Sequence, residues 1–194
     1  RRGFVESPLE KAEVVILNTC SVLDKPEQKV YAALGRIKYE TRKVPGAFAV
    51  VAGCVAQQIG AGFFERFPQV RLVVGGDGLA MAPDAIERLH ADPSLRLNLT
   101  DFSEVYPERD PALPAHGEAG DMPPAAFVNI MQGCDNFCTY CIVPFTRGRQ
   151  KSRSVAAILD ECRSLVDSGA KEITLLGQNV NAYGLDKHAA ADTS

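Results

Sequence analysis

Short apolar runs alternate with amphipathic segments over the first 90 residues. The runs lie at residues 14–17, 48–52 and 70–74, and they are nearly continuous in apolar side chains. Runs of this kind are typical of strands that are buried on both faces of a sheet. The first segment between them places Val30, Leu34 and Ile37 at helical spacing. Asp24 is a candidate N-cap for this helix, which should end near Lys43. The alternation predicts an α/β fold with a doubly wound parallel sheet.

The chain changes character after residue 90. Six of its 12 prolines fall between residues 91 and 124, which predicts a linker, with one short strand at 95–99. Residues 125–194 then supply an apolar run at 126–131, a helix from Val155 to about Asp167, and a strand at 172–176. This order is a βαβ unit. We therefore expect one α/β domain at 1–90, a linker at 91–124 and a second domain from 125.

Composition and charge narrow the class of protein. The 194 residues are 46% hydrophobic, which is enough to bury a sizeable core. No apolar run approaches the ~20 residues that a membrane helix needs. Charged residues follow Arg1 and Arg2 where the apolar part of an export signal would lie. We expect a cytoplasmic protein with no membrane contact. The net charge of −3 argues against a dedicated nucleic-acid binder, so an RNA substrate would need a local basic patch.

The cysteine spacing favours metal binding over disulfides. Cys134, Cys138 and Cys141 fall within eight residues, spaced C-x3-C-x2-C, directly after an apolar run. Thiolates cluster this tightly mainly to hold a metal or an iron–sulfur centre. Three thiolates leave one iron of a four-iron cluster open to a ligand that is not protein. A zinc site is the alternative, disfavoured because no fourth cysteine or suitably placed histidine follows.

Two further cysteines, Cys20 and Cys54, each follow a predicted strand. Ligands bind at the carboxyl ends of the strands in open parallel sheets. We therefore expect these two thiols at one edge of the first sheet, close enough to share a metal. Cys162 differs, because it lies within a predicted helix. It is interpreted as a small core residue.

Longer strings around the cysteines resemble a known family. The C-x3-C-x2-C loop with Tyr140 before its last cysteine is similar to the signature of radical S-adenosylmethionine (SAM) enzymes. The string GCDNFCTYCIVPFTRG at 133–148, Ser152-Arg153, and LLGQNVNAYG at 175–184 resemble the methylthiotransferases, and within them the bacterial tRNA branch. In radical SAM enzymes the open iron binds SAM. An electron from the cluster cleaves SAM to methionine and a 5′-deoxyadenosyl radical.

The resemblance implies a fold and a set of cofactors. The fold is a methylthiotransferase N-terminal α/β domain followed by the first βα units of a radical SAM partial TIM-type barrel. The cofactors are SAM and two [4Fe–4S] clusters in the full-length protein. Cys20 and Cys54 match two ligands of the N-terminal cluster, whose third normally lies on an earlier strand. We therefore expect a fragment without the extreme N-terminus, most of the barrel and the C-terminal RNA-binding domain, and inactive alone.

The implied function is methylthiolation of the isopentenyl-modified adenosine next to the tRNA anticodon. It would take place in a monomer that receives electrons from a flavodoxin or ferredoxin. One alternative is a methylthiotransferase that acts on a ribosomal protein or on threonylcarbamoyl-adenosine in tRNA. Another is a non-catalytic iron–sulfur electron-transfer module. No side chain of this chain is assigned as catalytic.

Several side chains near the loop are candidates for ligand contact. By resemblance Tyr140 faces the adenine of SAM, with ordinary packing as the alternative. Gln178 and Asn179 end a predicted strand, where amides bond SAM or position the substrate, unless they only form a turn. Arg147 and Arg153 match family motifs in a basic run that either attracts tRNA phosphates or is a solvated charged loop. Within that run, Arg149 stands where the family often has an acidic residue.

Overall fold

A computed structural model describes residues 3–21, 25–107 and 124–186. The chain forms two compact units, residues 1–101 and 102–194. No helix within the described ranges combines the length and the apolar character needed to cross a membrane.

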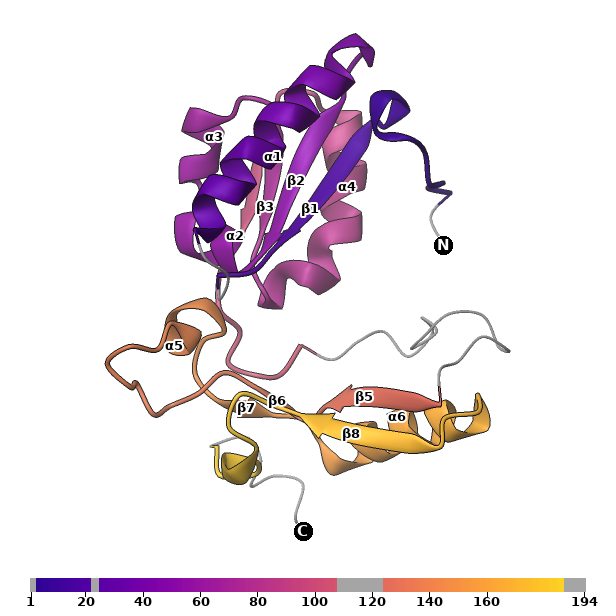
Figure 1. Ribbon diagram of the computed structural model, residues 1–194, viewed down its shortest axis with the longest axis vertical. Helices are drawn as coiled ribbons and strands as arrows, with labels where there is room; N and C mark the ends of the chain where they lie inside the picture. Colours follow the sequence, from indigo (N-terminus) through magenta and orange to yellow (C-terminus); the bar gives the residue numbers. More distant parts are fainter. Residues whose placement is uncertain (1–2, 22–24, 108–123, 187–194) are drawn as a thin grey trace. The chain divides into compact units, whose positions relative to one another are not determined.

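The first unit is a four-stranded parallel sheet with helices on both faces (Figure 1). Its strands lie side by side in chain order: β1 (Val14–Thr19), β2 (Phe48–Gly53), β3 (Val70–Val74) and β4 (Leu97–Leu99). One face is covered by α1 (Pro26–Glu40), α2 (Cys54–Ile59) and α3 (Gly62–Arg66), and the other by α4 (Ala82–Ala91). The predicted parallel α/β sheet is therefore confirmed.

The core of this unit explains the continuous apolar runs. Side chains alternate across β2, so Ala49 and Val51 pack towards the face of α1. Phe48, Val50 and Ala52 pack towards α4. Both sets are almost fully buried, because helices cover both faces of the sheet. A central strand of this kind has no polar face.

Details of three elements differ from the sequence prediction. The first helix, α1, ends at Glu40 and is followed by a 3₁₀ turn, Thr41–Lys43. Its expected N-cap, Asp24, lies outside the described residues. The amphipathic segment between β2 and β3 forms two helices, α2 and α3, which are divided at Gly60, whose φ is +53°. The first unit runs beyond the expected boundary at residue 90, because β4 pairs with β3.

The second unit contains the predicted βαβ motif. β5 (Ala125–Asn129) and β8 (Glu172–Leu176) form a parallel pair, and α6 (Val155–Asp167) packs against it through Ile158 and Leu165. The hydroxyl of Ser154 caps α6 by accepting from the N–H of Ala157. The predicted strand at 126–131 is divided at Ile130. Its end, β6 (Met131–Gln132), pairs antiparallel with β7 (Lys151–Ser152), so the cysteines lie in the connection between β6 and β7.

Candidate metal centre

The cysteine loop is fastened at Gly133, the residue that precedes its first cysteine. Gly133 has a φ of +80°, and a Cβ there would lie 2.1 Å from the carbonyl oxygen of Arg149, so only glycine fits. Its N–H donates to Oε1 of Gln178 at 2.8 Å. The N–H of Cys134 donates to the carbonyl oxygen of Gly148 at 3.3 Å. These contacts bring the two ends of the loop together and join them to the residues after β8.

The three thiols of the loop differ in exposure. Cys134 is buried, Cys138 is exposed and Cys141 is half-buried, and all three are free. The N–H of Cys141 donates to the carbonyl oxygen of Cys138 at 2.9 Å, which closes a tight turn around Tyr140. Within the described residues, no three cysteine, histidine, aspartate or glutamate side chains converge as metal ligands do, and this includes the three thiols.

The three thiols are nevertheless the type of ligand that an iron–sulfur cluster requires. Three free thiols on one short loop, two of them reachable from solvent, are the ligands that iron–sulfur clusters take from proteins. The assignment of Cys134, Cys138 and Cys141 as ligands depends on this chemistry and on their spacing, and it stays a prediction.

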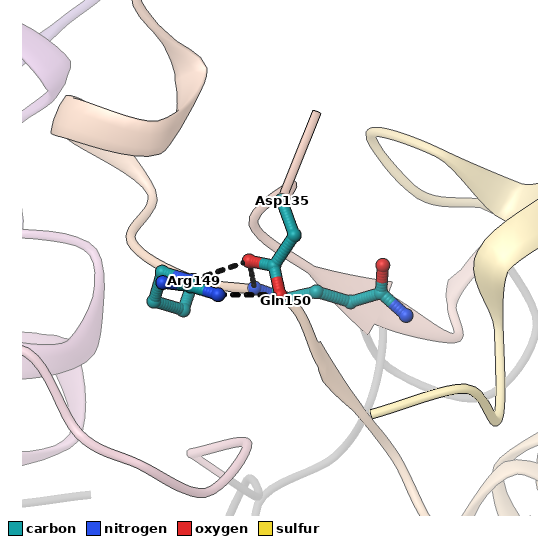
Figure 2. A network of polar contacts seen from close by, with 3 residues as sticks. All are labelled: Asp135, Arg149 and Gln150. Carbon is teal, nitrogen blue, oxygen red and sulfur yellow. Dashed lines mark hydrogen bonds and ion pairs between the residues drawn. The ribbon is translucent and has the colours of Figure 1, made fainter. Parts of the chain in front are cut away.

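Arg149 joins the two sides of the loop through an ion pair (Figure 2). Its Nε lies 2.7 Å from Oδ1 of Asp135, and its Nη2 lies 3.2 Å from Oδ2. The backbone N–H of Gln150 donates to the same Oδ1 at 2.9 Å. The hydrogen bond from Arg149 is the main cause that lowers the pKa of Asp135, and the same bond raises the pKa of Arg149.

The basic run consists of Arg147, Arg149, Lys151 and Arg153, and two of these four cations are buried within the second unit. Lys151 is only 1% exposed, and its Nζ donates to the carbonyl oxygen of Ser103 at 3.0 Å. Arg153 is also buried. Arg147 is half-buried, and Arg149 is paired with Asp135. The run therefore does not form a continuous solvated charged loop, which is one of the two alternatives that its sequence leaves open.

The guanidinium of Arg153 contacts three of the described residues of the second unit. It pairs with Glu161 at 2.5 Å, donates to the carbonyl oxygen of Asn129 at 2.8 Å and lies 5.3 Å from the ring centroid of Tyr106. These contacts connect the residue that follows β7 to β5 and α6. The suggested role of Arg147 in substrate binding stays a prediction, and the suggested role of Arg153 competes with the structural role that these contacts give it.

The other candidate ligand residues lie near the loop or after β8. Tyr140 is 92% exposed at the tip of the loop. Gln178 is exposed and contacts the loop through Gly133, while Asn179 is half-buried before the 3₁₀ turn Val180–Ala182. Their contacts with SAM stay predictions.

Sequence reasoning missed three supporting contacts around β7. The ion pair of Asp135 with Arg149 is one of them. In the others, the hydroxyl of Tyr183 donates to the carbonyl oxygen of Arg153, and the N–H of Gly184 donates to Oγ of Ser152. The only signal for the first contact was a pair of opposite charges 14 residues apart. The end of the LLGQNVNAYG string therefore braces β7.

Cys20 and Cys54 follow paired residues of neighbouring strands in the first unit. Thr19 of β1 is in register with Gly53 of β2, so both cysteines lie at the carboxyl edge of the sheet, as predicted. The hydroxyl of Thr19 donates to the carbonyl oxygen of Ala52 at 2.7 Å and accepts from the N–H of Val55 at 3.2 Å. Cys20 is exposed and Cys54 is buried. A metal shared by the two thiols stays a prediction.

Comparison with known proteins places both units in one family. Residues 2–75 match the model of "Uncharacterized protein family UPF0004", and residues 128–191 match the "Radical SAM superfamily". The tRNA-2-methylthio-N(6)-dimethylallyladenosine synthase of Lawsonia intracellularis is 66% identical over 96% of this chain and 41% of its own length. That of Nitratidesulfovibrio vulgaris Hildenborough is 65% identical over 99% of the chain and 42% of its own length.

The chain belongs to the radical SAM methylthiotransferases. It spans about two fifths of the length of these curated relatives. Family membership implies SAM and [4Fe–4S] clusters as cofactors and confirms the resemblance on which the sequence analysis relied.

A solved structure agrees with this fold. The radical SAM methyltransferase TsrM from Kitasatospora setae, solved with tryptophan and the SAM analog aza-SAM, superimposes with a TM-score of 0.55 at 15% identity. The match covers 91% of this chain and 38% of that structure. At this identity the likeness supports the fold alone.

Proposed function

We propose that the full protein carrying this chain methylthiolates the isopentenyl-modified adenosine next to the tRNA anticodon. The observation that carries this proposal is identity of 64–66% to four synthases named for this product, over 96–99% of the chain. Such identity over both units favours the tRNA substrate over a ribosomal protein.

The cysteines of this chain would contribute ligands to two cofactor sites. Cys134, Cys138 and Cys141 would hold the cluster that binds SAM, and Cys20 with Cys54 would contribute thiols to the second. When bound, these groups supply one-electron cleavage of SAM, hydrogen abstraction from an unreactive aromatic carbon, and a sulfur that a second SAM methylates. Tyr140, exposed within the loop, would contact the adenine of SAM.

The remaining parts of the proposal concern partners and place of action. A flavodoxin or ferredoxin would deliver the electron, because the cleavage consumes one that the chain itself does not supply. The enzyme would work as a monomer in the cytoplasm, where its tRNA substrate is found. The half-buried Arg147 is the cation of the basic run that we propose for a tRNA phosphate.

Two measurements test the function. First, tRNA nucleosides are digested and compared between a strain that lacks the gene and the same strain complemented with it. Loss of the 2-methylthio group from the isopentenyl adenosine, restored by the gene but not by a Cys134→Ala variant, is expected. Loss of the 2-methylthio group from threonylcarbamoyl-adenosine would assign that tRNA nucleoside as the substrate. An unchanged tRNA profile with a changed ribosomal protein would assign the ribosomal protein.

The second measurement separates an enzyme from an electron carrier. The full protein is reconstituted anaerobically with iron and sulfide, reduced, and supplied with SAM. We expect release of 5′-deoxyadenosine. A protein that gains its clusters and releases none would be a non-catalytic iron–sulfur module.

A further inference from the structure

Arg149 contacts the segment between the first two loop cysteines at two of its three residues. That segment comprises residues 135–137 and is called the spacer here. The guanidinium of Arg149 forms the two-point ion pair with Asp135. It also lies 5.3 Å from the ring centroid of Phe137, within the range of a cation–π interaction.

The backbone of the same residue contacts the start of the loop. The carbonyl oxygen of Arg149 occupies the space beside Gly133 where a Cβ would otherwise be, and the next N–H, of Gln150, donates to Asp135. Side chain and main chain of residues 149–150 therefore contact the residues on either side of Cys134 in the sequence.

The spacer itself has a conformation that requires support. Phe137 has a φ of +45°, which is unfavourable for any residue with a Cβ. Its ring packs edge-on against Phe145 of α5 (Val143–Thr146), with the centroids 6.1 Å apart. A strained residue persists only where its surroundings fix it, and Arg149 and Phe145 supply contacts on the Phe137 ring.

We propose that Arg149 is a positioning residue that fixes the spacer between Cys134 and Cys138, so that both thiols are presented together to an iron–sulfur cluster. The proposal rests on the proposed function, because it takes these cysteines as cluster ligands. A bidentate guanidinium suits this role, since it sets both the distance and the plane of the carboxylate. It also explains why a cation of the basic run pairs with an aspartate of the loop.

The pair is largely exposed, with 73% of the Arg149 side chain and 41% of the Asp135 side chain accessible. Exposed pairs contribute little to global stability. The effect of breaking this one should therefore appear in the order of the loop and in how long it retains iron, and not in the melting temperature.

The test compares the Arg149→Gln variant with the parent after anaerobic reconstitution of the full protein. Iron loss to a chelator is followed in low and in high salt, and amide exchange of residues 134–138 is measured in the metal-free protein. We expect at least a threefold faster iron loss and faster exchange in Arg149→Gln. The difference should shrink in high salt, because salt screens an exposed ion pair.

Arg163→Gln is the matched control. It removes the same charge from an exposed pair with Asp160, at 2.9 Å on α6, away from the loop, and should leave both readouts at parental values. Arg149→Lys keeps the charge but cannot form the two-point contact with Asp135. Its rates of iron loss and amide exchange should lie between those of the parent and those of Arg149→Gln. If Arg149→Gln has a lower melting temperature than the parent, the positioning role is tested by comparing Arg149→Lys with the parent.

The outcomes separate this inference from the function on which it rests. A parent that takes up no iron at Cys134, Cys138 and Cys141 would overturn both. If the parent binds iron but loses it as fast as Arg149→Gln and Arg149→Lys do, only the positioning role of Arg149 is overturned.

Discussion

The side-chain oxygen of Gln178 accepts a hydrogen bond from the backbone N–H of Gly133 at 2.8 Å. Gln178 follows β8, and Gly133 immediately precedes the first loop cysteine. The carboxamide that the sequence suggested as a SAM contact is thus also a support for the cysteine loop. A single side chain couples the end of the parallel pair to the start of the metal-binding segment.

Replacing this acceptor should loosen the start of the loop. In Gln178→Ala the N–H of Gly133 loses its partner, and we expect amide exchange of residues 133–134 to rise roughly fivefold to tenfold, equivalent to about 1–1.4 kcal/mol. Gln178→Glu keeps an acceptor oxygen and should stay near the parent. Exchange measured by mass spectrometry checks this, and equal protection in Gln178→Ala and the parent would contradict it.

Removing Arg153 should destabilise the second unit. Its guanidinium is buried and paired with Glu161, and loss of one partner from a buried pair costs about 3 kcal/mol or more. We expect Arg153→Ala to lower the unfolding free energy by about that amount, measured by urea denaturation. The control Arg163→Ala should cost well under 1 kcal/mol.

The same variant distinguishes a structural from a substrate role for Arg153. A lost phosphate contact would reduce the salt dependence of tRNA binding by about one unit of slope. We expect no change in that slope in folded Arg153→Ala protein. Parental stability with a reduced slope would show that Arg153 contacts tRNA.

The hydroxyl of Thr19 should matter for the thiols of the first unit. It bridges the carbonyl oxygen of Ala52 and the N–H of Val55, and so connects the end of β1 to the start of α2. Thr19→Val keeps the shape but leaves both groups without this partner, at a cost of about 1–3 kcal/mol. Thr19→Ser keeps the hydroxyl and should cost less.

Iron content provides the second measurement for this position. We expect Thr19→Val to retain less iron than Thr19→Ser, and Cys20→Ala and Cys54→Ala each to lose iron relative to the parent. Parental iron in both cysteine variants would exclude a metal at the carboxyl edge of the first sheet.

Cys162 should behave differently from the loop cysteines. It is half-buried on α6 and packs against the core of the second unit, so Cys162→Ala should cost about 1 kcal/mol through lost packing. The iron content of the reconstituted Cys162→Ala protein should equal that of the parent. Cys134→Ala should instead lose the loop cluster, and a comparable iron loss in Cys162→Ala would make Cys162 a ligand.

Features that depend on neighbouring residues could be predicted from the sequence alone. Continuous apolar runs specified strands buried on both faces, as β2 shows, because the hydrophobic pattern is set along the chain. The C-x3-C-x2-C spacing is likewise local, and it indicated the cluster and the family without any knowledge of the fold.

The contacts of the charged and amide side chains, in contrast, become visible only in the folded chain. Lys151 and Arg153 had the character of surface residues, but the period of two along and beyond β7 turns both inward. Their partners among the described residues include Ser103, Asn129 and Glu161, and Ser103 is 48 residues from Lys151 in the sequence. Gln178 reaches Gly133 over 45 residues. No local pattern encodes such pairs, because the packing of β5, α6 and β8 creates them.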